Sequence, residues 1–143
     1  MSDDPTRLEL TRVVAAERTR VWRAWTQEWA QWMWPERFGT VVELDARAGA
    51  AYRISSESVG MAVSGEVVEA EAPHRLVLTW RWDGETEETL VTVVLREVPG
   101  GTEIVLRHER HAEASQRDSH AEGWAHCLDR LGAHLSAQSA SAG

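Results

Sequence analysis

A long amphipathic segment near the carboxyl end, residues 115–135, is the feature that most limits what this chain can fold into. Its apolar residues recur at steps of three and four, so they share one face of an α-helix: Trp124, Cys127, Leu128, Leu131 and Leu135. Asp129 and Arg130 fall off that face. Ser115 precedes Asp118 by three residues, a spacing that can cap a first helical turn, and we predict that the helix starts there. A helix with one apolar face needs a partner surface that covers it.

Most of the sequence before this helix alternates between apolar and polar residues with a period of two, which predicts β-strands. The predicted strands are Leu8–Val14, Val41–Arg47, Ala51–Ser56, Met61–Glu69, Arg75–Trp82, Thr86–Glu97 and Thr102–Arg110. Turns that contain glycine or proline punctuate the last six, and such short connections favour antiparallel hairpins. We therefore predict an α+β fold in which a curved antiparallel sheet of about seven strands wraps around the C-terminal helix.

Residues 16–34 depart from this alternation and have helical spacing. Pro35 ends the helical stretch, because the residue before a proline is pushed out of helical geometry, and Thr26-Gln27 divides it into two short helices. The stretch holds five tryptophans: Trp22, Trp25, Trp29, Trp32 and Trp34. Aromatic residues at helical spacing usually pack in a core, whereas Trp32 or Trp34 could instead form the mouth of a cavity. The sequence leaves both interpretations open.

The composition fits one domain, which we place at residues 8–135, with flexible termini at 1–7 and 136–143. A chain of 143 residues can bury roughly two thirds of its unfolded surface. Fifteen basic residues, all arginine, against 23 acidic ones give a net charge of -8, which disfavours a nucleic-acid partner. The sequence shows neither a signal peptide nor a stretch of membrane-spanning length. With a single cysteine, these features predict a cytoplasmic protein without a membrane partner.

Several short segments occur in an order that matches a known family. The longest is GEVVEAEAPHRLVLTW at residues 65–80, and the others are Trp32–Pro35, Arg47–Gly49, Gly100–Thr102, His108, and Gly123-Trp124 with Leu128 and Leu131. Together they resemble START-like (SRPBCC) domains, in the branch named for the activator of the Hsp90 ATPase. The resemblance runs from about Leu8 to Leu135 and implies a helix-grip fold that keeps a cavity for an apolar ligand between helix and sheet.

Two features depart from that family. Ala50 follows Gly49 where the family usually has a second glycine, which predicts a less open backbone at this point. The eukaryotic co-chaperone also carries a separate N-terminal domain, for which this sequence has no counterpart. We therefore expect no chaperone partner.

The strand alternation predicts which side chains face the helix, because successive residues of a strand point to opposite faces. We predict that thirteen inward-facing residues line a ligand site: Trp32, Tyr52, Ile54, Met61, Val63, Trp80, Trp82, Val93, Leu106, His108, His120, Trp124 and Cys127. Aromatic walls with few polar groups are typical of small-molecule pockets. Trp80, Trp82 and Trp124 could equally well fill the interior, and the sequence does not decide between the two.

His108, His120 and Cys127 form the most specific constellation. Positions 120 and 127 share a helix face, and His108 ends a strand that should run beside it. Imidazole and thiolate are good zinc ligands, but the spacing is generic and no carboxylate is placed to orient either histidine. We predict hydrogen bonding or packing for these three, and neither a metal nor another cofactor. Other polar groups are expected to face solvent: His111, His126, His134 and the hairpin edge Glu85–Glu88.

These features predict a cavity protein that binds a small hydrophobic or aromatic molecule. An enzyme of the polyketide cyclase or aromatase type is one alternative, with His108 or His120 as its acid or base. We assign no catalytic residue, because the sequence contains neither a nucleophile elbow nor a phosphate-binding loop. A chaperone-associated interaction module is the other alternative, and a homodimer is left open.

Overall fold

The computed structural model describes residues 6–142, with side chains described as far as Ala137. The helices are α1 (Arg18–Gln27) and α2 (Ala114–Ala142), with two 3₁₀ turns, η1 (Trp29–Gln31) and η2 (Glu36–Phe38). The strands are β1 (Leu8–Val14), β2 (Val41–Leu44), β3 (Ala51–Ser56), β4 (Met61–Glu71), β5 (Arg75–Trp82), β6 (Thr89–Val98) and β7 (Gly101–Glu109). Neither described helix is apolar over a stretch long enough to cross a membrane.

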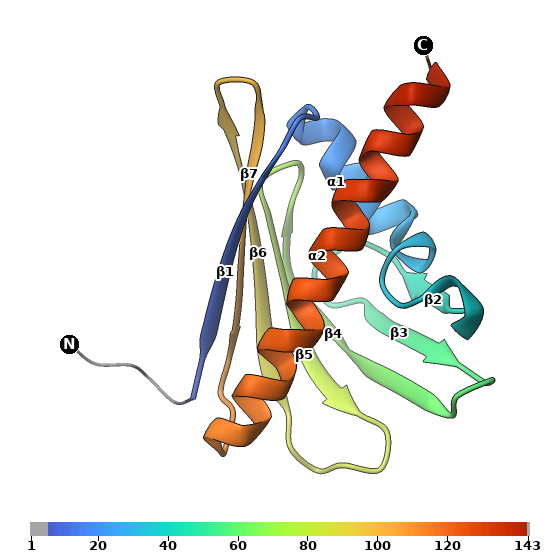
Figure 1. Ribbon diagram of the computed structural model, residues 1–143. Helices are drawn as coiled ribbons and strands as arrows, with labels where there is room; N and C mark the ends of the chain where they lie inside the picture. Colours follow the sequence, from blue (N-terminus) through green and yellow to red (C-terminus); the bar gives the residue numbers. More distant parts are fainter. Residues whose placement is uncertain (1–5, 143) are drawn as a thin grey trace.

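Within the described residues the strands form one seven-stranded sheet in the order β1-β7-β6-β5-β4-β3-β2. Every neighbouring pair is antiparallel. The sheet curves around α2, which runs diagonally across its concave side, while α1 and the 3₁₀ turns lie beside the C-terminal half of that helix (Figure 1). The predicted α+β helix-grip architecture is therefore confirmed.

The element boundaries differ from the predictions in two instructive places. The predicted helical stretch 16–34 is regular only to Gln27, and the chain then makes η1 before Pro35, so the break falls at Glu28. The C-terminal helix begins at Ala114 and continues beyond the predicted end at Leu135 to Ala142. Residues 136–142 contain neither glycine nor proline and are rich in alanine, the best helix former, so nothing in that segment stops the helix. Of the termini predicted to be flexible, residues 1–5 and 143 lie outside the described residues.

The core lies between the concave face of the sheet and α2. Alternation along β7 buries Ile104, Leu106 and His108 completely, and the helix contributes Leu128 and Leu131. The predicted inward faces of the sheet and the helix therefore meet. Each large apolar side chain removed from water here stabilises the fold by about 1.5–3 kcal/mol.

The backbones of β4 and β5 approach so closely at position 65 that only glycine fits there. A Cβ atom added at Gly65 would lie 2.2 Å from the carbonyl oxygen of Thr79, and the Tyr52 hydroxyl donates a hydrogen bond to that same oxygen. Glycine is favoured at position 49 for another reason, because the φ of Gly49 is +91° and lies in the left-handed region. Its amide donates to the carbonyl of Val67 at 2.8 Å, which attaches the turn before β3 to β4.

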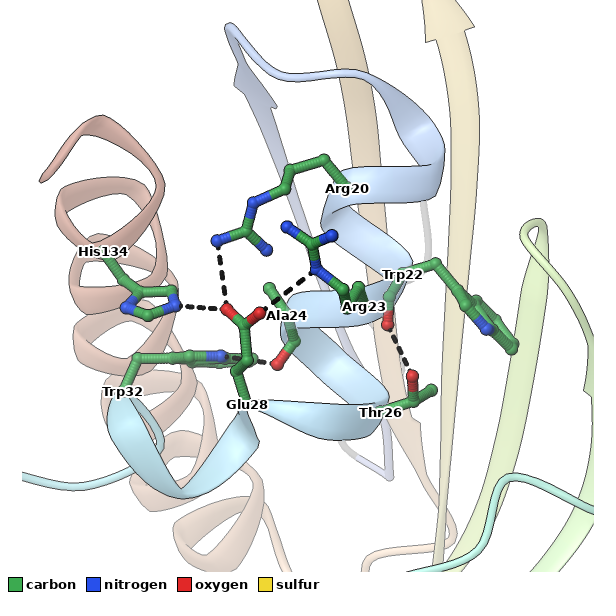
Figure 2. A network of polar contacts seen from close by, with 8 residues as sticks. All are labelled: Arg20, Trp22, Arg23, Ala24, Thr26, Glu28, Trp32 and His134. Carbon is green, nitrogen blue, oxygen red and sulfur yellow. Dashed lines mark hydrogen bonds and ion pairs between the residues drawn. The ribbon is translucent and has the colours of Figure 1, made fainter. Parts of the chain in front are cut away.

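Glu28, directly after α1, connects the helical segments at the end of the sheet (Figure 2). Its carboxylate accepts hydrogen bonds from Arg20 Nη2 at 3.0 Å, Arg23 Nε at 3.2 Å and His134 Nε2 at 2.7 Å. Burial alone would raise the pKa of Glu28, but the hydrogen bonds from His134 and Arg20 outweigh it and lower that pKa below its ordinary value. The prediction that His134 faces solvent was wrong, because its side chain binds Glu28 and is only 10% exposed.

Candidate functional site

A pocket of about 640 Å³ lies between the first half of α2, the ends of β4 and β5, and the segment Met33–Pro35. Its volume is in the range of sites for small organic molecules. Apolar and aromatic side chains line it: Met33, Trp34, Pro35, Met61, Trp80, Trp82, Trp124 and Cys127. Polar residues also line it: Glu85, Glu87, Thr89, Ser115, Gln116, Ser119, His120, His126 and Arg130, with Gly123 on the helix.

Four tryptophans form the aromatic part of the lining. The Trp34 and Trp82 rings stack with centroids 6.2 Å apart, and Trp80 contacts Trp82 edge to face at 5.9 Å. Trp80 also packs against Trp124 of α2 at 5.2 Å. The strand and the helix therefore meet through aromatic rings, as their alternation patterns predicted. The indole nitrogen of Trp80 is buried and has no hydrogen-bond partner among the described residues.

The structure divides the predicted ligand-binding residues into two groups. Six line the pocket: Met61, Trp80, Trp82, His120, Trp124 and Cys127. The others are buried but do not line it: Trp32, Tyr52, Ile54, Val63, Val93, Leu106 and His108. Trp32 packs edge to face on Trp25 and donates its indole N–H to the carbonyl of Ala24 at 2.9 Å, so it belongs to the core. The lining position near this segment is Trp34.

A cluster of three histidines lies behind the aromatic wall. His108 is the second-last residue of β7, His111 follows that strand, and His120 is on α2. The ring centroids of His108 and His120 lie 4.4 Å apart, and those of His108 and His111 4.5 Å apart. His111 is 2% exposed, so the prediction that it faces solvent was wrong. The backbone N–H of His111 donates to the carbonyl of Thr6, and this bond draws the residue inward after the strand ends.

The hydrogen bonds assign one tautomer to each of these histidines. An indole N–H can only donate, so His108 Nδ1 accepts from Trp124 at 3.0 Å and His120 Nε2 accepts from Trp82 at 2.9 Å. His108 therefore carries its proton on Nε2, which lies 2.6 Å from the hydroxyl of Thr89. The Thr89 hydroxyl in turn donates to the carbonyl of Trp80 at 3.2 Å.

The same logic continues along the second chain of hydrogen bonds. With Nε2 accepting, His120 carries its proton on Nδ1 and donates to His111 Nε2 at 2.7 Å. His111 Nδ1 then donates to the carbonyl of Thr6 at 2.9 Å, and a carbonyl can only accept. All three imidazoles are thus satisfied in the neutral form.

For His108 and His120, burial and the charge of neighbouring histidines both favour the neutral form. Burial lowers the pKa of His108 to about 2, with a further contribution from the charge that His120 and His111 would carry. Burial likewise lowers the pKa of His120 to about 4, assisted by His111. The ligating atoms of the three histidines lie within 4.8 Å of one another, close enough to consider a metal ion. Every ring nitrogen is already engaged in a hydrogen bond, however, so a metal ion would bind here only by displacing those partners.

Cys127, predicted to join His108 and His120, lies elsewhere in the wall. Its thiol donates to the carbonyl of Met33 at 2.8 Å. Burial raises the pKa of this thiol to about 11, although Arg130 acts in the opposite direction. The thiol is therefore protonated at neutral pH and unreactive as a nucleophile.

Sequence reasoning missed two charged parts of the lining. Arg130 was placed off the apolar face of the helix, yet it is half-buried in the pocket wall and donates to the carbonyls of Trp32 and Met33. Glu85 and Glu87 were expected only to face solvent, but they also line the opening of the pocket. Neither position carried a signal, because an arginine or a glutamate beside a helix face or in a hairpin is ordinarily solvated.

Comparisons with known proteins agree with this architecture. The family described as Activator of Hsp90 ATPase homolog 1-like protein matches residues 15–136. A solved structure from Rhodobacter sphaeroides is 28% identical, with a TM-score of 0.79 over 94% of each chain. One from Chromobacterium violaceum is 28% identical, with a TM-score of 0.78 over 91% of this chain and 96% of that one.

DynU16, a protein in the dynemicin biosynthetic locus, is 22% identical with a TM-score of 0.80. That likeness covers 92% of this chain and 47% of DynU16, and it shows the fold alone. A search among curated proteins gave no match. The match over residues 15–136, together with a sheet that closes around α2, shows that this chain belongs to the Activator of Hsp90 ATPase homolog 1-like family of the START-like (SRPBCC) superfamily.

Proposed function

We propose that this protein binds a small hydrophobic or aromatic molecule in the pocket between α2 and the sheet. The observation that carries the proposal is the tryptophan-lined space of about 640 Å³ in the place where helix and sheet would otherwise pack. Rigid aromatic walls with a few polar groups at the edge are the usual lining of small-molecule sites.

The unpaired indole of Trp80 supports the same proposal, because among the buried indoles without an acceptor in the described residues, those of Trp25, Trp29 and Trp80, only that of Trp80 lines the pocket. A buried N–H without an acceptor costs about 1–3 kcal/mol, and a ligand oxygen against this wall would supply one. His108, His111 and His120 are fully engaged with protein atoms, so they act as a polar support for the wall.

Gly123 offers a direct test because it lines the pocket and faces open space. A Cβ atom added there would meet no other atom within 4 Å, so the side chain of Gly123→Leu starts in open space and should occupy part of the pocket. Gly132, on the same helix, has equally open surroundings but does not line the pocket, which makes Gly132→Leu the matched control. Both changes should keep the fold, since leucine is the better helix former.

The probe is the neutral aromatic dye N-phenyl-1-naphthylamine, followed by its fluorescence. We expect the native protein and Gly132→Leu to bind it alike, and Gly123→Leu to bind roughly tenfold more weakly. Equal affinity in all three proteins would show that the dye does not enter this pocket. A natural ligand would be identified by native mass spectrometry of freshly purified protein, as an added mass that is present on the native protein and reduced on Gly123→Leu.

An enzyme that acts on such a ligand is the second candidate, and one observation favours it. His120 lines the pocket and presents a neutral imidazole, the form in which a histidine accepts a proton. Its Nε2 atom accepts from Trp82, so catalysis would require the ligand to displace that indole. Mass spectrometry of the ligand before and after incubation tests this: His120→Asn should stop conversion while the dye still binds, and an unaltered ligand mass with native protein would exclude the candidate.

A further inference from the structure

Arg130 is a half-buried cation in the pocket wall without a carboxylate partner. Its Nε donates to the carbonyl of Trp32 at 3.0 Å and its Nη2 to the carbonyl of Met33 at 2.8 Å, with a longer contact to the sulfur of Cys127 at 3.5 Å. Among residues with described side chains, Arg130 forms no ion pair, and its Nη1 makes no hydrogen bond. Within the described part of the chain, the acceptors that bind this cation are therefore neutral.

The two carbonyls hold the guanidinium in a fixed orientation. They occupy the edge formed by Nε and Nη2, so the plane of the group is set before any ligand arrives. The Nη1 amino group remains without an acceptor among the described side chains, and on a guanidinium that is charged at every physiological pH it can donate a charge-assisted hydrogen bond to a carboxylate oxygen. A fixed donor group of this kind avoids most of the ordering cost that a flexible side chain would lose on binding.

The opposite end of the pocket carries negative charge. Glu85 and Glu87 line it there, beside the start of α2. With its amide nitrogen facing Glu87, Gln116 donates to both carboxylate oxygens, at 2.8 and 3.1 Å, which fixes Glu87 near the helix start. Arg130 is fourteen residues beyond Gln116, roughly 21 Å along the helix axis. An anionic group in the pocket would thus be repelled at one end and attracted at the other.

We propose that the pocket selects an organic anion, whose apolar or aromatic body lies against the tryptophans and whose carboxylate, or similar acidic group, binds Arg130. This inference rests on the proposed function and adds the chemical class of the ligand. The overall charge of -8 cannot provide this selectivity, because it repels anions in general. Recognition depends on the local cation.

The test compares two dyes that share an aromatic body and differ in charge. 8-Anilinonaphthalene-1-sulfonate carries a sulfonate, and N-phenyl-1-naphthylamine lacks it. We expect Arg130→Gln to weaken binding of the anionic dye about tenfold or more, the usual worth of a charge-assisted hydrogen bond, and to change binding of the neutral dye less than about twofold. Arg96→Gln removes the same charge from an exposed site on β6 and should change neither affinity.

A competition measurement addresses the carboxylate itself. Naphthalene-2-carboxylate should displace the neutral dye from native protein at least about tenfold better than the uncharged naphthalene-2-carboxamide, and Arg130→Gln should remove that preference. If Arg130→Gln fails to fold in a thermal melt, Arg130→Lys keeps the charge without the planar fork and should retain only part of the preference.

The outcomes separate the two proposals. Equal losses for both dyes in Arg130→Gln, or equal displacement by acid and amide, would overturn anion selection while leaving the ligand pocket in place. Failure of the neutral dye to bind native protein would overturn both. A loss restricted to the anionic compounds is the result that this proposal requires.

Discussion

Acidification from pH 7 to pH 5 should destabilise this protein through its buried histidines. The pKa of His108 is lowered to about 2 and that of His120 to about 4, so both remain neutral in the folded state throughout this range. In the unfolded chain both return to their ordinary pKa of about 6.5 and take up protons. The unfolded state therefore binds more protons than the folded state, and stability must fall as the pH falls.

The size of the effect follows from the distance between the pH and the unfolded pKa. One pKa unit corresponds to about 1.4 kcal/mol, and pH 5 lies about 1.5 units below the ordinary value for histidine. Each of the two histidines thus favours unfolding by about 2 kcal/mol at pH 5, and the pair by about 4 kcal/mol. That is a large part of the 5–15 kcal/mol typical of a domain.

Carboxylates contribute little in the same interval. The lowered pKa values of Glu28 and Asp83 add stability that is present above their ordinary values of 4.5 and 3.8 and is lost as the pH falls below them. The interval from pH 7 to pH 5 therefore isolates the histidines. Urea unfolding followed by circular dichroism, at half-unit steps of pH, gives the free energy of unfolding directly.

Two variants make the measurement specific. His108→Gln removes one of the two groups, so its loss of stability between pH 7 and pH 5 should fall from about 4 to about 2 kcal/mol, whatever its stability at pH 7. His126→Gln changes an exposed histidine of α2 and should preserve the full loss. A flat profile in the native protein, or an identical slope in His108→Gln, would refute the assignment of neutral buried histidines.

Two further changes test contacts that position the pocket. Glu28→Ala removes the carboxylate that connects α1 with α2 and should lower the free energy of unfolding by about 2–4 kcal/mol, because it leaves the partly buried Arg20 without its ion pair. Asp83→Ala, at an ion pair whose two side chains are exposed, should lower it far less in the same urea titration. Gly65→Ala places a Cβ atom 2.2 Å from the carbonyl oxygen of Thr79 and should lower the stability, followed in a thermal melt, by about 2 kcal/mol or more. Its control, Gly132→Ala, lies in open space on a helix and should raise the stability by about 1 kcal/mol. The reverse ranking would contradict the close packing between β4 and β5.

The sequence predicted the fold well because periodicity carries the relevant information. The alternation in β5 and β7 has only one way to hide its apolar face, and the stripe on α2 is the only long surface that can cover it. The ends of the helices were predicted less accurately where neither glycine nor proline marks them. The first helix ends before Glu28 without glycine or proline, at a residue whose carboxylate is held by Arg20, Arg23 and His134, and the last of these lies 106 positions away.

The candidate site was predictable only in part, for a different physical reason. The periodicity of strands and helices identifies inward side chains, and it placed Trp80, Trp82 and Trp124 correctly on facing surfaces. It does not distinguish a side chain that faces the pocket from one that is covered by the core, as with Trp34 and Trp32. That difference depends on where the chain turns around Pro35, which no periodic pattern encodes.

Two indole–imidazole hydrogen bonds connect the neutral state of the histidines with the shape of the pocket. Trp82 and Trp124 line the pocket, and each holds its ring in place by donating to an imidazole nitrogen, of His120 and His108 respectively. A protonated imidazole has no lone pair to accept such a bond, so charging either histidine would release an indole from the wall. The burial that makes these histidines costly to protonate therefore also keeps the aromatic wall rigid, and a rigid wall limits which ligands fit. The histidine cluster therefore stabilises the pocket wall, because only its uncharged imidazoles can accept the hydrogen bonds of the two indoles.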